Sequence, residues 1–439
     1  MSVNESTGRF IAAFNEQRLA GKDGVPSWFD ELRQAGMASF AELGFPTTRN
    51  EEWKYTNVEA AVSLPFGHAN GEAKSFGTAD ILANTFVETR APRLVFLNGV
   101  YAPELSSTQG LPSGVRLARL AELSARDDSF LASQIGRYVD LRRNAFVALN
   151  TAFMRDGAVV VIPPGCRLAV PIYLVYASGA LDRPVISYPR TLILLGADSE
   201  VKIVESYAAL NGGNYLCNAV TELVGDAASI AHHCRLQREG EAAFHVGTLT
   251  AHLGRGSRLT ANAVTLSGAL VRNNVHVLLN GEGAECVLNG LYIGADKQHI
   301  DNFTEIEHAK PRATSLELYK GVLDGAARGV FNGKIVVHKD AQKSDARQTN
   351  RNLLLSPDAV VNTKPQLEIY ADDVKCSHGS TIGQLDPDAL FYLRSRGLGA
   401  DEAQSLLSFA FASDIVGRLK IDSLRQRLDD YLVGKFRRI

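Results

Sequence analysis

Cysteine is scarce in this sequence of 439 residues, which contains only five. Cys166, Cys217, Cys234, Cys286 and Cys376 are widely scattered, and no two of them form a C-x-x-C pair. An odd, scattered set of cysteines argues against a framework of disulfides. It also argues against a self-contained four-cysteine cluster site, because the ligands of such sites usually stand close together in sequence.

The sequence also has no excess of one charge and no long apolar run. Lysine and arginine total 46 and aspartate and glutamate 48, which gives a formal net charge of −2, and the two signs are interspersed. Nucleic acid is therefore not expected as a partner, because phosphate binding needs a basic face. No apolar run approaches the roughly 18 residues that span a bilayer, and no secretory signal is visible, so we expect a cytoplasmic protein with no membrane partner.

Signatures of common enzyme classes are missing as well. The stretch Gly329-Val330-Phe331-Asn332-Gly333-Lys334 is one residue shorter than a phosphate loop and is followed by Ile335 instead of serine or threonine. The sequence contains neither a G-x-S-x-G nucleophile elbow nor an H-E-x-x-H zinc helix. We therefore expect no catalysis by this chain.

A repeat dominates the sequence from Gly157 onward. Short β-rich runs follow polar or glycine turns, and their starting residues are separated by 29, 29, 29, 27 and 30 residues, by subtraction. The six starting residues are Ile172, Val201, Ile230, Leu259, Cys286 and Leu316. A period of this length with no helix between the runs predicts a mainly β fold, a right-handed parallel β-helix, with a β-sandwich as the alternative.

Helical patterns flank the repeat on both sides. Apolar residues recur at three- and four-residue spacing in residues 10–20, 26–43 and 117–153, and again after residue 386. The predicted organisation is a mostly helical region at 1–156, a β-helix core at 157–384 and a C-terminal helical domain at 385–439. Because stacked strands leave open ends, we expect the helical regions to cap both ends of the stack.

The segment 364–383 contains the strongest candidate for metal chemistry. Cys376 and His378 stand two residues apart on a predicted strand, so their side chains point the same way. A thiolate and an imidazole side by side suit iron or zinc, but two ligands do not complete a site. The structural alternative is a buried cysteine beside a hydrogen-bonded histidine.

Two weaker clusters share the same logic. His232 and Cys234 lie on one face of a predicted strand, although stacking inside a solenoid explains them adequately. His299 and Asp301 also share a face, and an interface or turn network is the preferred interpretation of this pair.

Several contiguous motifs resemble the SufB/SufD family of iron–sulfur cluster assembly proteins. The match is most specific over residues 290–400, and the stretch 49–56 resembles the D-type member of the family. The motifs are Gln298-His299-Ile300-Asp301, Ala309-Lys310-Pro311-Arg312-Ala313-Thr314-Ser315, Gly329-Val330-Phe331-Asn332-Gly333, the run 343–354, Lys375-Cys376-Ser377-His378-Gly379 and Phe391-Tyr392-Leu393-Arg394-Ser395-Arg396-Gly397.

The resemblance implies a parallel β-helix flanked by helices and a complex of one B-type and one D-type subunit on two copies of a SufC ATPase. The C-terminal helices would dock the SufC-like ATPase, and exposed strands would pair with the SufB-like paralogue. The B type carries a cysteine where this chain reads Thr349-Asn350-Arg351-Asn352, which favours the D type. The docking residues implied are Phe391, Tyr392, Leu393, Arg394, Leu406 and Phe409.

The resemblance also implies a role for His378, with Cys376 beside it, at the interface where a nascent iron–sulfur cluster forms. The partner would supply the missing ligands. Reduced flavin is implied for the complex as a whole, without a residue here, and an isolated chain could form a homodimer. The predicted function is thus a non-catalytic scaffold; the alternatives are a stand-alone β-helix lyase or acyltransferase and a purely structural ATPase adaptor.

Overall fold

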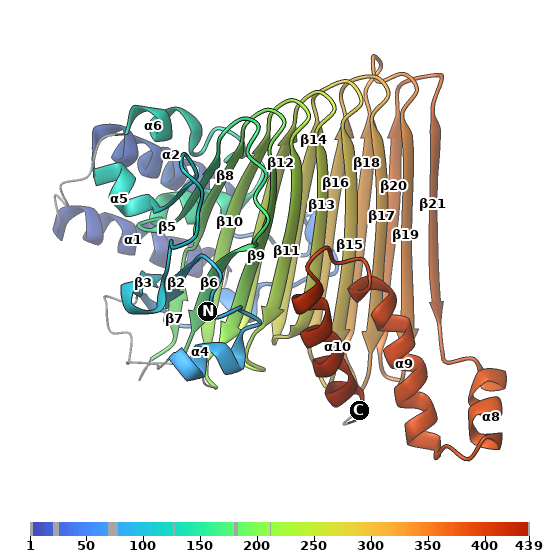
Figure 1. The fold of residues 1–439 in the computed structure, drawn as a ribbon. Coiled ribbons are helices and arrows are strands. Elements are labelled where there is room, and N and C mark those ends of the chain that lie inside the picture. The colour runs from blue at the N-terminus through green and yellow to red at the C-terminus, as the bar shows by residue number, and fades with distance from the viewer. Residues whose placement is uncertain are drawn as a thin grey trace.

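The chain folds into a β-solenoid in which two long sheets face each other (Figure 1). The structure is a computed structural model and describes residues 3–20, 26–68, 78–125, 128–179, 183–210 and 212–437. Along most of the solenoid, successive strands alternate between the two sheets, so each turn contributes one strand to each sheet. The paired strands run parallel through these turns, which confirms the predicted parallel β-helix and rules out the sandwich.

Among the described residues, the first sheet has 11 strands. Its members, in spatial order, are β20 (Val360–Ile369), β18 (Arg328–Val337), β16 (His299–His308), β14 (Leu270–Leu279), β12 (Phe244–Leu253), β10 (Tyr215–Gly225), β8 (Arg190–Leu195), β5 (Gly157–Ile162) and β4 (Arg116–Arg119), with β7 (Val185–Ser187) pairing with β10 and β1 (Gly67–His68) pairing with β7.

The second sheet has 10 strands within the part of the chain that the structure describes. Its members, in spatial order, are β21 (Lys375–Gly383), β19 (Asp345–Leu354), β17 (Thr314–Leu323), β15 (Glu285–Gly294), β13 (Arg258–Ser267), β11 (Ile230–Arg238), β9 (Glu200–Ala209), β6 (Ile172–Ser178), β2 (Arg93–Leu97) and β3 (Val100–Tyr101).

The register of the second sheet differs slightly from the predicted repeat. Val201 and Leu259 both pair with Ala231, not with Ile230, and Cys286 pairs with Ser315, not with Leu316. Ile172 pairs with Ile203, two residues beyond the predicted Val201. Ile230 is only half-buried and Leu316 is exposed, whereas Ala231 and Ser315 are buried. The predicted starts at Ile230 and Leu316 are therefore one residue too early and one residue too late, because both are apolar residues that face outward.

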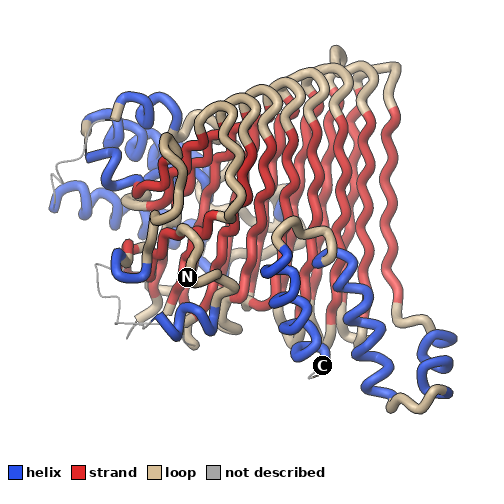
Figure 2. Tube along the Cα trace, viewed as in Figure 1, coloured by secondary structure: helices blue, strands red, loops and turns tan. Residues whose placement is uncertain are grey.

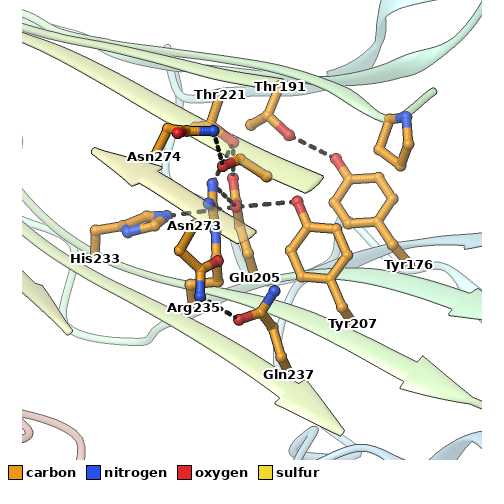
Figure 3. A network of polar contacts seen from close by, with 12 residues as sticks. Tyr176, Thr191, Glu205, Tyr207, Thr221, His233, Arg235, Gln237, Asn273 and Asn274 are labelled. Carbon is orange, nitrogen blue, oxygen red and sulfur yellow. Dashed lines mark hydrogen bonds and ion pairs between the residues drawn. The ribbon is translucent and has the colours of Figure 1, made fainter. Parts of the chain in front are cut away.

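The inward-facing side chains form the core between the two sheets. Most are apolar, but a polar network crosses the middle of the solenoid (Figure 3). Thr221 and Tyr207 donate to the Glu205 carboxylate at 2.7 and 3.2 Å, and Arg235 lies 3.4 Å from it. Burial alone would raise the pKa of Glu205, but His233 and Arg235 lower it to about 2. Mutual pairing thus keeps this carboxylate ionised in the core.

Most of the N-terminal helices cover the outer face of the first sheet near its beginning, whereas Ile81, in the helix at residues 78–84, packs with Tyr173 of β6 on the outer face of the second sheet. Phe146 and Leu149 of α7 pack with Leu216 of β10 and Val246 of β12. The elements of this region are α1 (Val3–Ala20), α2 (Ser27–Leu43), η1 (Glu51–Trp53), α3 (Glu59–Val62), α4 (Thr78–Asn84), η2 (Pro103–Leu105), α5 (Leu120–Ala125), α6 (Ser129–Gln134) and α7 (Ala145–Phe153).

The predicted helical pattern over residues 117–153 is not one helix. It begins with β4 and then divides into α5, α6 and α7. Two N-cap residues explain the division. The Asp128 side chain accepts a hydrogen bond from Leu131 N, and the Asn144 side chain accepts from Phe146 N and Val147 N. Each cap starts a new helix in the middle of an apolar periodicity.

Two of the three C-terminal helices lie along the outer face of the second sheet, and the first extends past the end of the sheet (Figure 2). The three are α8 (Pro387–Ser395), α9 (Ala400–Val416) and α10 (Asp422–Phe436). Ile415 of α9 and Leu428 of α10 join a buried cluster with Val264 of β13 and Leu291 of β15. The expectation that the C-terminal helices cap the end of the stack is therefore wrong for α9 and α10, because their apolar side chains pack on the outward face of the middle turns.

The solenoid ends at β20 and β21, and in the described part of the chain no helix covers this end (Figure 1). Strands β2, β3 and β4 of the N-terminal region extend the two sheets at the opposite end, so the division at residues 156 and 384 stays a prediction. No described helix is both long and apolar enough to cross a membrane.

Candidate functional site

The predicted site residues Cys376 and His378 lie on β21, the edge strand of the second sheet. Neither β21 nor β20, the edge strand of the first sheet, contains a buried residue. Both sheets therefore end in long strands with accessible side chains. Such an edge is a template for pairing with another chain unless something protects it.

The register with β19 explains the orientation of the two side chains. Cys376 stands opposite Ala346, and His378 stands opposite Gln348. Because Ala346 and Gln348 are buried, Cys376 and His378 face the interior side of the solenoid at its open end. Cys376 is half-buried in a small apolar cluster, whereas His378 is exposed and has no hydrogen-bond partner among the described residues.

The backbone of β21 offers a free row of hydrogen-bonding groups. Lys375 N donates to Ser344 O at 2.9 Å, so alternate residues from Lys375 onward pair with β19. Successive residues of a strand direct their N–H and C=O groups to opposite sides. Cys376, His378 and Ser380 therefore present theirs to the free edge.

The chemistry of this site is incomplete within the described chain. Burial, with a contribution from Asp345, raises the pKa of the Cys376 thiol. The thiol is therefore protonated at neutral pH, and metal binding would release its proton. Among the described residues, no third histidine, cysteine, aspartate or glutamate lies close enough to form a three-ligand group with Cys376 and His378.

A second candidate surface lies on α8, which contains no buried residue. Phe391 is 73% exposed and Tyr392 is 56% exposed, while Arg394 is exposed and Leu393 is half-buried. The helix begins with a cap, in which the Asp386 side chain accepts from Asp388 N, and with Pro387 in its first turn. A well-capped helix that buries nothing of its own presents an apolar face to a partner.

Leu406 and Phe409 on α9 line a groove between α9 and α10 with a volume of about 710 Å³. Leu406 is 46% exposed, whereas Phe409 also packs against the cluster that holds α9 on the second sheet. Lys320 of β17 anchors the same helix: its Nζ lies 2.7 Å from Asp414 Oδ2 and donates to Phe411 O at 3.1 Å.

The two weaker candidate pairs make contacts that stabilise the fold. Cys234 is buried in the cluster beneath α9 and α10, and His232 lies 3.8 Å from Glu200. His299 Nε2 and Asp301 both contact Thr56 Oγ1, the His299 contact measuring 2.9 Å. These contacts hold the 49–56 element on the outer face of the first sheet.

Sequence reasoning missed a buried cluster of ligand-type side chains. The candidate ligand atoms of Cys217, Glu239 and His245 all lie within 4.8 Å of one another. Cys217 on β10 is directly opposite His245 on β12, and Glu239 follows β11. Two come from different strands and the third from the loop after β11, so no local motif identifies them. An alignment of the repeats on the first sheet would have placed Cys217 beside His245.

Comparisons with known proteins agree with the fold. A family model described as the SufBD core domain of SUF-system FeS cluster assembly matches residues 177–411, and one described as the SufBD protein N-terminal region matches residues 4–174. An iron–sulfur cluster assembly SufBD family protein of Synechocystis is 36% identical over 90% of this chain and 88% of its own length. The iron–sulfur cluster assembly protein SufD of Escherichia coli is 32% identical over 90% of each chain. Its Bacillus subtilis namesake is 25% identical over 95% of each chain.

Proposed function

Because this chain belongs to the SufB/SufD family of iron–sulfur cluster assembly proteins, we propose that it is a non-catalytic scaffold subunit that pairs with a SufB-like subunit. The observation that carries this proposal is the open end of the solenoid, where two accessible edge strands stand beside Cys376 and His378. A second solenoid can continue the sheets across this end by strand pairing.

In this proposal the nascent iron–sulfur cluster is assembled at the interface between the two subunits. His378 and Cys376 offer two ligands, and a SufB-like partner supplies the others. An imidazole can be protonated and binds a cluster more weakly than a thiolate does. A mixed ligand set therefore suits a cluster that must later leave for its recipient.

The C-terminal helices dock a SufC-like ATPase in this proposal. The docking surface consists of Phe391, Tyr392, Leu393 and Arg394 on α8 and of Leu406 and Phe409 at the groove. The ion pair between Lys320 and Asp414 anchors this surface to the solenoid, because it links α9 to β17, which is two strands from the open end. Movement of a docked ATPase can thus be transmitted through α9 and β17 to the edge strands that pair with the other subunit.

Three further expectations belong to the same proposal. The complex forms in the cytoplasm, reduced flavin binds to the complex as a whole, and the isolated chain pairs with itself through the same edge strands. No residue of this chain is assigned to the flavin.

The test uses this chain assembled with its SufB-like and SufC-like partners without oxygen, as wild type and as His378→Ala. We expect an intact complex whose bound iron and sulfide fall about tenfold, because a ligand of the cluster is lost. His338→Ala is the control, since His338 is also an exposed histidine, lies on the turn after β18 and, among the described residues, pairs its side chain only with Glu307 at the surface.

Unchanged iron and sulfide in the assembled His378→Ala complex would contradict the scaffold role of this site. The chain would then be a structural adaptor for the ATPase, a role that the exposed face of α8 also supports. Turnover by the isolated chain would instead favour the β-helix enzyme.

A further inference from the structure

A buried group of mixed metal-ligand side chains lies far from the open end of the solenoid. Cys217, Glu239 and His245 are 1%, 4% and 0% exposed. β12, which contains His245, is four strands from β20 in the first sheet. At the usual strand spacing this separation is roughly 19 Å. The cluster is therefore distinct from Cys376 and His378.

The cluster is already organised by hydrogen bonds. Glu239 Oε1 lies 2.8 Å from His245 Nδ1, and the Tyr215 hydroxyl donates to Glu239 Oε2. Gly240 N in turn donates to the Tyr215 hydroxyl at 3.2 Å. A metal-binding carboxylate is typically oriented by such outer contacts. The Tyr215 contact leaves Oε1 facing His245 and the thiol of Cys217.

The other ring nitrogen of His245 is left free to hold a proton. His245 Nε2 is buried and has no partner within the described residues. Space is kept clear in front of it, because a Cβ at Gly247 would lie only 2.7 Å from Nε2. The ring is held edge-to-face by Tyr207, with the centroids 4.8 Å apart.

We propose that Cys217, Glu239 and His245 form a resident site for a divalent transition-metal ion of the zinc or ferrous type. One thiolate, one imidazole and one carboxylate are the donors that such ions prefer. The ion binds between Glu239 Oε1 and His245 Nδ1. The proton that these two atoms share moves to His245 Nε2, which has no other partner within the described residues, and the thiol of Cys217 releases its proton to solvent as the ion binds.

Charge balance supports a dication at this position. A thiolate and a carboxylate together neutralise it, whereas the nearby Arg235 is paired with Glu205 at 3.4 Å. Because all three ligands are buried, the ion enters as the chain folds, so it adds to the stability of the folded state.

The experiment uses the full chain with Cys376→Ala and His378→Ala, so that the open end cannot contribute ligands. Metal analysis of the purified protein identifies zinc or iron, and refolding with Co²⁺ tests the ligands by the sulfur-to-cobalt charge-transfer band. We expect about one ion per chain and a clear band. Cys217→Ser removes the band and weakens metal binding about tenfold or more.

Cys286→Ser is the matched control, because Cys286 is equally buried, at 1% exposed, on the inner face of β15. It is expected to keep both ion and band. Glu239→Gln, which preserves shape, serves if Cys217→Ser does not fold, and it too is expected to weaken binding. An absent band in the parent protein, or a band that survives both Cys217→Ser and Glu239→Gln, overturns the proposal. Because His378 is replaced by alanine in every protein of this experiment, its outcome is independent of the role proposed for His378.

Discussion

Glu317 is a carboxyl group buried inside the solenoid, two strands from the free edge at β21. Gln348 Nε2 donates to its Oε2 at 2.7 Å, and Gln348 stands opposite His378 on the next strand. Burial raises the pKa of Glu317 to about 7, although the hydrogen bond from Gln348 acts in the opposite direction. The folded state therefore holds this proton more tightly than the unfolded chain, and stability falls as pH rises from about 4.5 to 7.

Glu317→Gln removes the ionisable group and keeps the shape. We expect the variant to gain about 3 kcal/mol relative to wild type at pH 8 and almost nothing at pH 4.5, because only the wild type must ionise in the core. Urea unfolding of both proteins at the two pH values measures this difference. Glu285→Gln, the same substitution at a half-exposed position on β15, is the control for the loss of one carboxylate. An equal effect of Glu317→Gln at both pH values would contradict the prediction.

The position of a single residue could be predicted where it depends only on residues next to it in the sequence. Cys376 and His378 were found because a strand places residues two apart on one face, and the structure places both on β21. Glu317 and the Cys217 cluster were not found, because their environments are built by strands about 30 residues apart. Burial and partners of this kind depend on the register between turns, which the sequence leaves ambiguous by one or two residues.

At the scale of elements, α8 is the helix proposed to dock the ATPase. None of its nine residues is buried, so its side chains contribute little to the stability of this chain. We expect the double substitution Phe391→Ser and Tyr392→Ser to leave the unfolding midpoint unchanged and to weaken ATPase binding by about 2 kcal/mol or more, as loss of aromatic anchors usually does. Calorimetric titration with the SufC-like ATPase measures this.

Tyr370→Ser is the control for α8. Tyr370 is 62% exposed, but it follows β20 at the solenoid end and not the helical region. ATPase binding is expected to be unaffected by this change. Equal losses in the two variants would mean that exposed aromatic residues act nonspecifically, and the assignment of α8 would fail.

Elements were predictable from sequence to the extent that one periodicity governs them. The solenoid was recognised because every turn repeats the same strand and turn pattern. The 117–153 region was misread because Asp128 and Asn144 act as caps inside a continuous apolar pattern. The predicted position of α9 and α10 is also wrong. Their apolar faces indicate that both helices pack against the solenoid, but not whether they pack against its end or its side.

At the scale of the whole molecule, the two ends of the solenoid are different. The N-terminal end carries the antiparallel strands β3 and β4 and the surrounding helices, whereas β20 and β21 leave both sheets open. Protecting one edge and exposing the other restricts pairing to one direction. The molecule is therefore suited to form a closed pair at this end and not an extended fibre.

The last prediction tests this free edge with a single proline. The Ser380 N–H points away from β19, so Ser380→Pro leaves the β19–β21 ladder intact and removes one donor from the outer edge. We expect normal folding by circular dichroism but loss of pairing with a SufB-like subunit and of any homodimer, measured by analytical ultracentrifugation. Ser380→Ala controls for the lost side-chain hydrogen bond to Thr363 Oγ1, which measures 3.1 Å, and should still pair. A proline variant that assembles with wild-type affinity would show that the subunits meet through another surface.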